Sequence, residues 1–137
     1  MRFIDTNVFI HAILEIKRED KSIEETKRMA RTIINRINSG ERALTTVVHL
    51  SEFSNVMENY LNIEHLADII SKLLRHDNLI VEEVSKEEYM LSADYAKEFH
   101  IGINDALAVV KMEKYNINEI YSFDKDFDMT DKKRLVR

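Results

Sequence analysis

Residues 2–10 of the chain read RFIDTNVFI, and this stretch sets how the fold begins. Its apolar residues form two runs, Phe3-Ile4 and Val8-Phe9-Ile10, with the carboxylate of Asp5 between them. We predict a strand over residues 2–5 that turns directly into a short helix ending near residue 13. A short buried strand followed at once by a helix is typical of a parallel sheet that helices cover.

The remaining sequence alternates short apolar runs with longer amphipathic stretches. Further strands are predicted over residues 43–46, 79–84 and 119–123, with a short edge strand at residues 135–136. The order of these elements predicts an α/β fold. We expect a three-layer α/β/α domain with a mainly parallel sheet of four or five strands flanked by helices.

The helices are predicted from capping signals and from the spacing of apolar residues. Ser22 with Glu25, after a polar loop over residues 17–22, and Ser85 with Glu88 have the spacing of a capping box. Gly102 precedes the most apolar helix, predicted over residues 106–112. The apolar sets expected to face the core are Ile23, Thr26, Ala30, Ile33 and Ile37; Leu50, Phe53, Met57 and Tyr60; Ile63, Ala67, Ile70 and Leu74; and Met90, Ala93, Ala96 and Phe99.

The bulk composition fits a single domain over residues 1–137. An apolar share of 45% is ordinary for a globular protein, and the absence of Cys excludes disulfides and thiolate metal sites. No apolar run approaches the roughly 20 residues of a membrane span, and Asp5 comes too early for a secretory leader. We therefore expect a soluble, cytoplasmic protein without membrane contact.

The net charge of −5 counts against non-specific nucleic-acid binding, which depends on neutralising phosphates. A bound divalent cation or a local basic patch can offset this, so the charge does not exclude a nuclease. The basic cluster Lys132, Lys133 and Arg134 suits a solvated tail. Because it follows shortly after Asp124, contact with an RNA backbone is the alternative.

Four carboxylates fall in apolar surroundings. Asp5 interrupts the opening apolar runs, and Asp124 directly follows the predicted strand ending at residue 123. Glu52 has a valine four residues away on either side, so on a helix it shares a row with apolar side chains. Asp105 lies at the start of the most apolar helix. The other acids mostly sit in polar clusters and need only solvation.

Grouped carboxylates in apolar surroundings point to a bound cation. Ligands of open parallel sheets bind beyond the carboxyl ends of the strands, where these four acids can share one crevice. Like charges so placed repel, and a buried unpaired carboxylate is costly. Mg²⁺ and Mn²⁺ prefer oxygen ligands, so either ion could relieve the repulsion.

Each acid alone also has an ordinary structural interpretation. Asp105 suits a helix N-cap, and Glu52 suits a pair with an Arg or His at the edge of the core. Asp5 before Thr6-Asn7 suits a turn. Their joint placement at one edge of one sheet is what favours a metal site.

These residues resemble the motifs of the PIN domain family. Residues 5–10 (DTNVFI) are similar to its opening motif, and Ser51-Glu52 resembles the segment with its second acid. Residues 104–108 (NDALA) resemble the segment with the third acid, and residues 122–127 (SFDKDF) resemble the closing segment. The resemblance spans nearly the whole chain. Many stand-alone PIN domains of this length are VapC-type toxins of toxin–antitoxin pairs.

The resemblance implies an endoribonuclease that hydrolyses RNA phosphodiester bonds with one or two Mg²⁺ or Mn²⁺ ions, leaving 5′-phosphate and 3′-hydroxyl ends. Its implied catalytic and metal-holding acids are Asp5, Glu52, Asp105 and Asp124. Family members differ in which acid of the closing segment dominates; we favour Asp124, with Asp126 as the alternative.

Side chains next to these acids could orient the metal ligands or a water molecule, a role implied for Thr6, Asn7 and Ser122. The implied partners are an RNA substrate, an antitoxin protein and a second copy of the chain in a homodimer.

Two other classes of function remain open: a PIN-like scaffold that binds RNA or protein without cutting, and a metal-dependent phosphatase or phosphoacceptor of another α/β family. The intact acid set argues against the scaffold. Residues 124–135 do not form an EF-hand loop, because Met129 and Leu135 occupy its Gly and Glu positions. The five histidines show no metal-binding spacing, and most are expected at the surface or at helix ends.

Overall fold

The computed structural model describes residues 1–14 and 20–137. Its strands are β1 (Arg2–Ile4), β2 (Ala43–Thr46), β3 (Leu79–Glu82), β4 (Glu119–Tyr121) and β5 (Lys133–Leu135). Its helices are α1 (Thr6–Ile13), α2 (Lys21–Asn38), α3 (Val47–Met57), α4 (Ile63–Arg75), α5 (Lys86–Phe99) and α6 (Ile103–Lys114), with a 3₁₀ helix, η1 (Lys125–Met129). The predicted alternation of strands and helices is confirmed.

The strands form one sheet in the order β3-β2-β1-β4-β5, and every neighbouring pair is parallel. β1 is central, because Phe3 pairs with Leu44 of β2 on one side and with Ile120 of β4 on the other. A fully parallel sheet brings all carboxyl ends of its strands to one edge. The segments that follow β1, β2 and β4 therefore meet at that edge.

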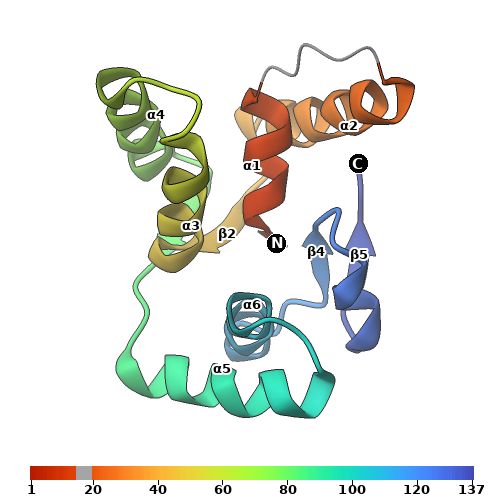
Figure 1. Ribbon diagram of the computed structural model, residues 1–137. Helices are drawn as coiled ribbons and strands as arrows, with labels where there is room; N and C mark the ends of the chain where they lie inside the picture. The colour runs from red at the N-terminus through yellow and green to blue at the C-terminus, as the bar shows by residue number, and fades with distance from the viewer. Residues whose placement is uncertain (15–19) are drawn as a thin grey trace.

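Helices cover both faces of the sheet, as a three-layer α/β/α fold requires. Neighbouring residues of a strand point to opposite faces, and Phe3 and Ile4 do so here. Ile4 packs in one core with Val8 of α1 and Ile33 of α2, whereas Phe3 packs in a second core with Val109 of α6. Figure 1 shows α5 and α6 together on one side and α1 to α4 on the other. The predicted fold class is confirmed.

One of the two predicted capping boxes is correct. At α5, the Ser85 hydroxyl accepts from the Glu88 backbone N–H, and the Glu88 carboxylate accepts from the Ser85 backbone N–H. At α2 the prediction is wrong, because Asp20 is the N-cap and its carboxylate accepts from the Ser22 backbone N–H at 2.9 Å. The helix therefore starts one residue before Ser22. Residues 17–19 of the predicted polar loop lie outside the described residues.

The buried faces of two helices, α4 and α5, differ from the predicted ones, and on α3 one residue of the predicted face lies beyond the helix. On α4 the side facing the core carries Leu66, Ile69, Ile70 and Leu73, whereas Ile63, Ala67 and Leu74 are exposed. α3 ends before Tyr60, which is exposed, and Met90 of α5 is exposed too. These helices carry more apolar residues than one face needs, so periodicity does not select the buried face.

Three strands end earlier than predicted, β1 at Ile4, β3 at Glu82 and β4 at Tyr121, and β5 begins two residues before the predicted edge strand. Ser122 and Phe123 therefore lie beyond the end of β4, although the Ser122 backbone N–H still donates to the Leu135 carbonyl of β5 at 3.1 Å. None of the helices in the described ranges is long and apolar enough to cross a membrane.

Candidate active site

The predicted acids converge at the carboxyl edge of the sheet. Asp5 directly follows β1, and Asp124 follows β4, the neighbour of β1. Glu52 lies on α3, the helix that β2 leads into, and Asp105 lies in the first turn of α6. Four separate segments of the chain thus contribute one carboxylate each to the same edge.

Asp5 is the buried member of the group, with 3% of its surface exposed. Its Oδ1 accepts from the Thr6 backbone N–H at 2.9 Å, and its Oδ2 accepts from the Ser122 hydroxyl at 2.7 Å. Burial raises the pKa of Asp5 to about 6 against these two hydrogen bonds, which lower it. The charges of Glu52 and Asp124 also act upward and are already included in that value.

Asp105 carries the largest perturbation of any acid described. Burial raises its pKa to about 8, and the charges of Asp5, Asp124 and Glu52 and a hydrogen bond with Asp124 act in the same direction. Without a counter-charge, Asp105 is therefore largely protonated at neutral pH. A strongly perturbed acid among like charges in a cleft is typical of a functional site.

The oxygens needed to hold a cation are close together. Carboxylate oxygens of Asp105, Asp124 and Asp126 lie within 4.8 Å of one another. Asp5 and Glu52 are outside this set of three, although their charges act on Asp105. A cavity of about 440 Å³ opens beside these three acids, and the residues that line the cavity include Glu52, Asp105 and Asp124. An all-oxygen donor set with several like charges fits a hard divalent cation.

Of the three predicted supporting residues, Ser122 and Asn7 tie the ends of β1 and β4 together. The buried Ser122 hydroxyl donates to Asp5 and accepts from the Asp124 backbone N–H at 3.0 Å. The Asn7 side-chain oxygen accepts from the Phe123 backbone N–H at 3.3 Å. The Thr6 hydroxyl instead donates to the His49 carbonyl at 3.0 Å, so Thr6 contacts Asp5 through its backbone only.

Glu52 is held by Asn104, which was not among the predicted site residues. The Asn104 side-chain N–H donates to Glu52 Oε2 at 2.7 Å, and the Asn104 side-chain oxygen accepts from the Tyr89 hydroxyl at 2.8 Å. Asn104 stands next to Asp105 in a motif that the sequence analysis did single out. Tyr89 gave no such signal, because α5 reaches the site only through the packing of α5 on α6.

His49 fixes the backbone of Asn104. Its Nε2 lies 3.0 Å from the Asn104 carbonyl, and its Nδ1 lies 2.7 Å from the Thr46 hydroxyl. Burial lowers the pKa of His49 to about 4, so the ring is neutral, with Nε2 donating and Nδ1 accepting. His49 lies in the first turn of α3, one of the helix ends expected of most histidines, but it is buried rather than at the surface.

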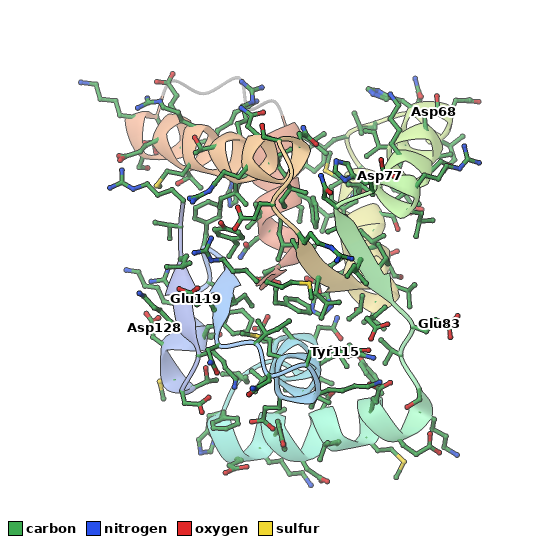
Figure 2. All side chains as sticks on the ribbon, turned by 180° about the vertical axis from the view of Figure 1, so that it is seen from behind. Asp68, Asp77, Glu83, Tyr115, Glu119 and Asp128 are labelled. Atoms are coloured by element: carbon green, nitrogen blue, oxygen red, sulfur yellow. The ribbon has the colours of Figure 1, made fainter. Side chains whose placement is uncertain are left out.

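The basic cluster is not arranged around the cavity. Lys132 is nearly buried, with its ammonium 3.5 Å from Asp131, and the exposed Lys133 lies 4.0 Å from Glu119 at the start of β4. The Arg134 guanidinium donates to Asp128 at 3.1 and 3.2 Å and to the Ser122 carbonyl at 3.4 Å. Figure 2 shows Asp128 and Glu119 on the same side of the molecule. Only Arg134 thus contacts a residue of the acidic site.

Fold and site together define an α/β protein with a candidate divalent-cation centre at the carboxyl edge of a parallel sheet. The chain belongs to the PIN domain family, whose model matches residues 2–133.

Known proteins similar to the chain include ribonuclease VapC6 of Methanocaldococcus jannaschii, which is 24% identical over 74 residues. That match covers 54% of this chain and 48% of VapC6, so the matched region spans about half the length of this relative.

Two solved structures share the fold. VapC20 of Mycobacterium tuberculosis, described as a toxin that cleaves the sarcin-ricin loop, superposes with a TM-score of 0.73 at 17% identity, covering 93% of both chains. FitAcB of Neisseria gonorrhoeae superposes with a TM-score of 0.61 at 13% identity, covering 98% of this chain and 96% of its own.

Proposed function

We propose that this chain is a metal-dependent endoribonuclease and the toxin of a VapC-type toxin–antitoxin pair. The observation that carries the proposal is the convergence of Asp5, Glu52, Asp105, Asp124 and Asp126 from separate segments onto one sheet edge. Membership of the PIN domain family and the similarity to ribonuclease VapC6 support the same activity.

The ion is proposed to be Mg²⁺ or Mn²⁺, held by Asp105 and Asp124, with Asp5 and Glu52 completing its surroundings and Asp126 at the exposed rim. When bound, such a cation activates water and offsets the negative charge of a phosphodiester. Ser122 orients Asp5 and favours its ionised form by donating to its Oδ2, against the effect of burial. Asn104 holds one oxygen of Glu52, which leaves the other oxygen free to face the cavity.

The substrate is proposed to be RNA, since the chain resembles a ribonuclease and shares its fold with a toxin that cleaves the sarcin-ricin loop. An antitoxin protein and a second copy of the chain are the proposed partners. We take residues 1–137 as one PIN-like domain.

RNA cleavage tests the activity directly. Wild type, Asp5→Asn and Asp105→Asn are compared on a panel of single-stranded and structured RNAs with Mg²⁺, Mn²⁺ or EDTA. Asp77→Asn is the matched control, because this exposed aspartate precedes β3 and lies at the opposite, amino edge of the sheet (Figure 2). We expect cleavage only by wild type and Asp77→Asn, and only with a divalent ion.

Other outcomes distinguish the remaining classes. Hydrolysis of small phosphomonoesters without RNA cleavage would indicate a phosphatase, and RNA binding without any hydrolysis would indicate a scaffold. The toxin role predicts that expression of the lone chain arrests growth and that Asp5→Asn does not. Normal growth with active wild-type protein would contradict that role.

A further inference from the structure

The cavity beside the acids also has an apolar wall. Tyr89 of α5 and Ile103 at the start of α6 line it together with Glu52, Asp105 and Asp124. Tyr89 is 41% exposed and Ile103 is 46% exposed. Two large apolar side chains are thus open to solvent directly beside the candidate cation centre, where the acids alone would suffice to hold an ion.

Tyr89 is fixed in this place at both ends. Its hydroxyl donates to the Asn104 side-chain oxygen at 2.8 Å. Its backbone follows Glu88, which closes the capping box of α5 and forms an ion pair of 2.6 Å with the buried Lys111 of α6. The ring is therefore held against the cavity before any ligand arrives, and a ligand that contacts it need not order it first.

We propose that Tyr89 and Ile103 form a subsite for an unpaired nucleobase next to the scissile phosphodiester. This inference rests on the proposed ribonuclease function and adds to it the two side chains that contact the base. The phosphate belongs at the acids with their cation, and the adjoining base then meets the apolar wall. Unpaired bases commonly stack on exposed aromatic side chains, whereas a base inside a duplex has no free face.

The lining chemistry favours a base over a second phosphate. Among the described residues, those that line the cavity include no Lys or Arg, so nothing in the lining would neutralise another phosphate. A volume of about 440 Å³ falls within the range of small-ligand sites, which leaves room for more than an ion and its waters. An aromatic wall accepts every base, so the subsite selects unpaired RNA rather than one sequence.

RNA binding is measured with Ca²⁺ in place of Mg²⁺ or Mn²⁺, in order to limit cleavage during the measurement. Binding then tests the subsite separately from cleavage. A short single-stranded RNA that the wild type cuts is prepared with one abasic nucleotide at each position in turn. Affinities are measured by fluorescence anisotropy for wild type, Tyr89→Phe and Tyr89→Leu. Tyr115→Leu is the matched control, because Tyr115 is 42% exposed, its hydroxyl donates to Glu82, and it lies beyond the far end of α6 (Figure 2).

We expect Tyr89→Leu to weaken RNA binding about tenfold and Tyr89→Phe to weaken it less, because Phe keeps the ring but loses the hydrogen bond to Asn104. Tyr115→Leu should stay within about twofold of wild type. An abasic nucleotide at one position should weaken wild-type binding by a similar factor. For Tyr89→Leu the same abasic RNA should bind no worse than the intact RNA, because the two changes remove the same contact.

Three results would overturn the inference. If RNA is cut but no abasic position weakens wild-type binding, the subsite does not exist; this arm needs no variant protein. If the losses from Tyr89→Leu and from every abasic position simply add, Tyr89 does not contact a base. If wild type neither binds nor cuts any RNA, the proposed function fails and the inference fails with it.

Discussion

The Ser122 hydroxyl donates to the Asp5 carboxylate over 2.7 Å, although 117 positions separate the two residues in the sequence. This bond links the ends of β1 and β4, and it lowers the pKa of Asp5 while burial raises it. Because Ser122 also accepts from the Asp124 backbone N–H, one hydroxyl positions two of the candidate metal ligands.

Replacing Ser122 by Ala should therefore weaken cation binding in a pH-dependent way. Without the hydroxyl, the pKa of Asp5 rises above about 6, so more of the protein is protonated near neutrality. We expect Mn²⁺ to bind about tenfold more weakly at about pH 6, and the loss to shrink at about pH 8. Titration calorimetry of the variant beside Ser71→Ala, an exposed serine on α4, measures this. An equal loss at both pH values would contradict it.

The metal-free protein should lose stability as the pH rises. The fold raises the pKa of Asp105 to about 8 and that of Asp5 to about 6, so folding favours their protonated forms. That contribution is fully present below the ordinary carboxyl range and is lost as the pH rises through the folded values. Thermal melting in EDTA from about pH 7 to about pH 9 should show a falling Tm. Below that window His49 acts in the opposite direction, because the fold lowers its pKa from 6.5 to about 4.

Asp105→Asn should suppress this pH dependence. We expect the variant to melt about 5 °C above wild type at about pH 8 in EDTA, with a smaller gain at about pH 5. Excess Mn²⁺ should stabilise wild type and not the variant, because binding to the folded state alone raises Tm. A variant that melts lower than wild type at both pH values would show that Asp105 has a structural role instead.

Asp124 and Asp126 should differ in their importance for cleavage. Asp124 lines the cavity and contacts Asp105, whereas Asp126 is exposed at the rim. We expect Asp124→Asn to reduce RNA cleavage at least about a hundredfold, and Asp126→Asn about tenfold. Single-turnover cleavage rates of the two variants in Mn²⁺ measure this difference. If Asp126→Asn lost more activity than Asp124→Asn, Asp126 would be the main ligand of the closing segment.

Arg134 should act on the site rather than on RNA. Its bonds to Asp128 and to the Ser122 carbonyl connect β5, η1 and the turn that carries Asp124. We expect Arg134→Gln to weaken Mn²⁺ binding a few fold. A phosphate contact in single-stranded RNA contributes about 0.7 to the slope of log K against log salt. If Arg134→Gln shows the same salt slope as wild type and Lys133→Gln, the positioning role is supported. If the slope of Arg134→Gln is smaller by about 0.7, Arg134 contacts RNA.

The ion pair between Glu88 and Lys111 should stabilise the α5–α6 unit. Burial alone would raise the pKa of Glu88, but its bonds with Lys111 and Ser85 lower it to about 2. Glu88→Gln removes the nearer of the two carboxylates that, among the described residues, pair with the Lys111 ammonium. Lys111 is 1% exposed and keeps the Glu82 carboxylate at 3.9 Å, so we expect a cost of about 3 kcal/mol and a Tm lower by about 10 °C. The exposed neighbour Glu87→Gln should melt like wild type. Adding Lys111→Met to Glu88→Gln should recover most of the loss, and failure to do so would contradict the pairing.

Some features of this protein followed from the sequence alone. The strands and their places along the chain came from short apolar runs, because such runs differ from amphipathic helices in length and period. The capping box of α5 followed from Ser85 and Glu88, since both partners lie within one helical turn. The positions of Asp5 and Asp124 after strands placed them at one edge, because every strand of a parallel sheet ends there.

Other features required the tertiary structure. The outer face of α4 could not be chosen from its sequence, because that helix carries apolar residues on more than one side and only packing selects between them. The bond from Asn104 to Glu52 joins residues 52 positions apart, and the bond from Tyr89 to Asn104 depends on how α5 packs on α6. The sequence determined which side chains reach the sheet edge. Which neighbours orient them was decided only by tertiary packing, since hydrogen bonds between distant segments leave no periodic trace in the chain.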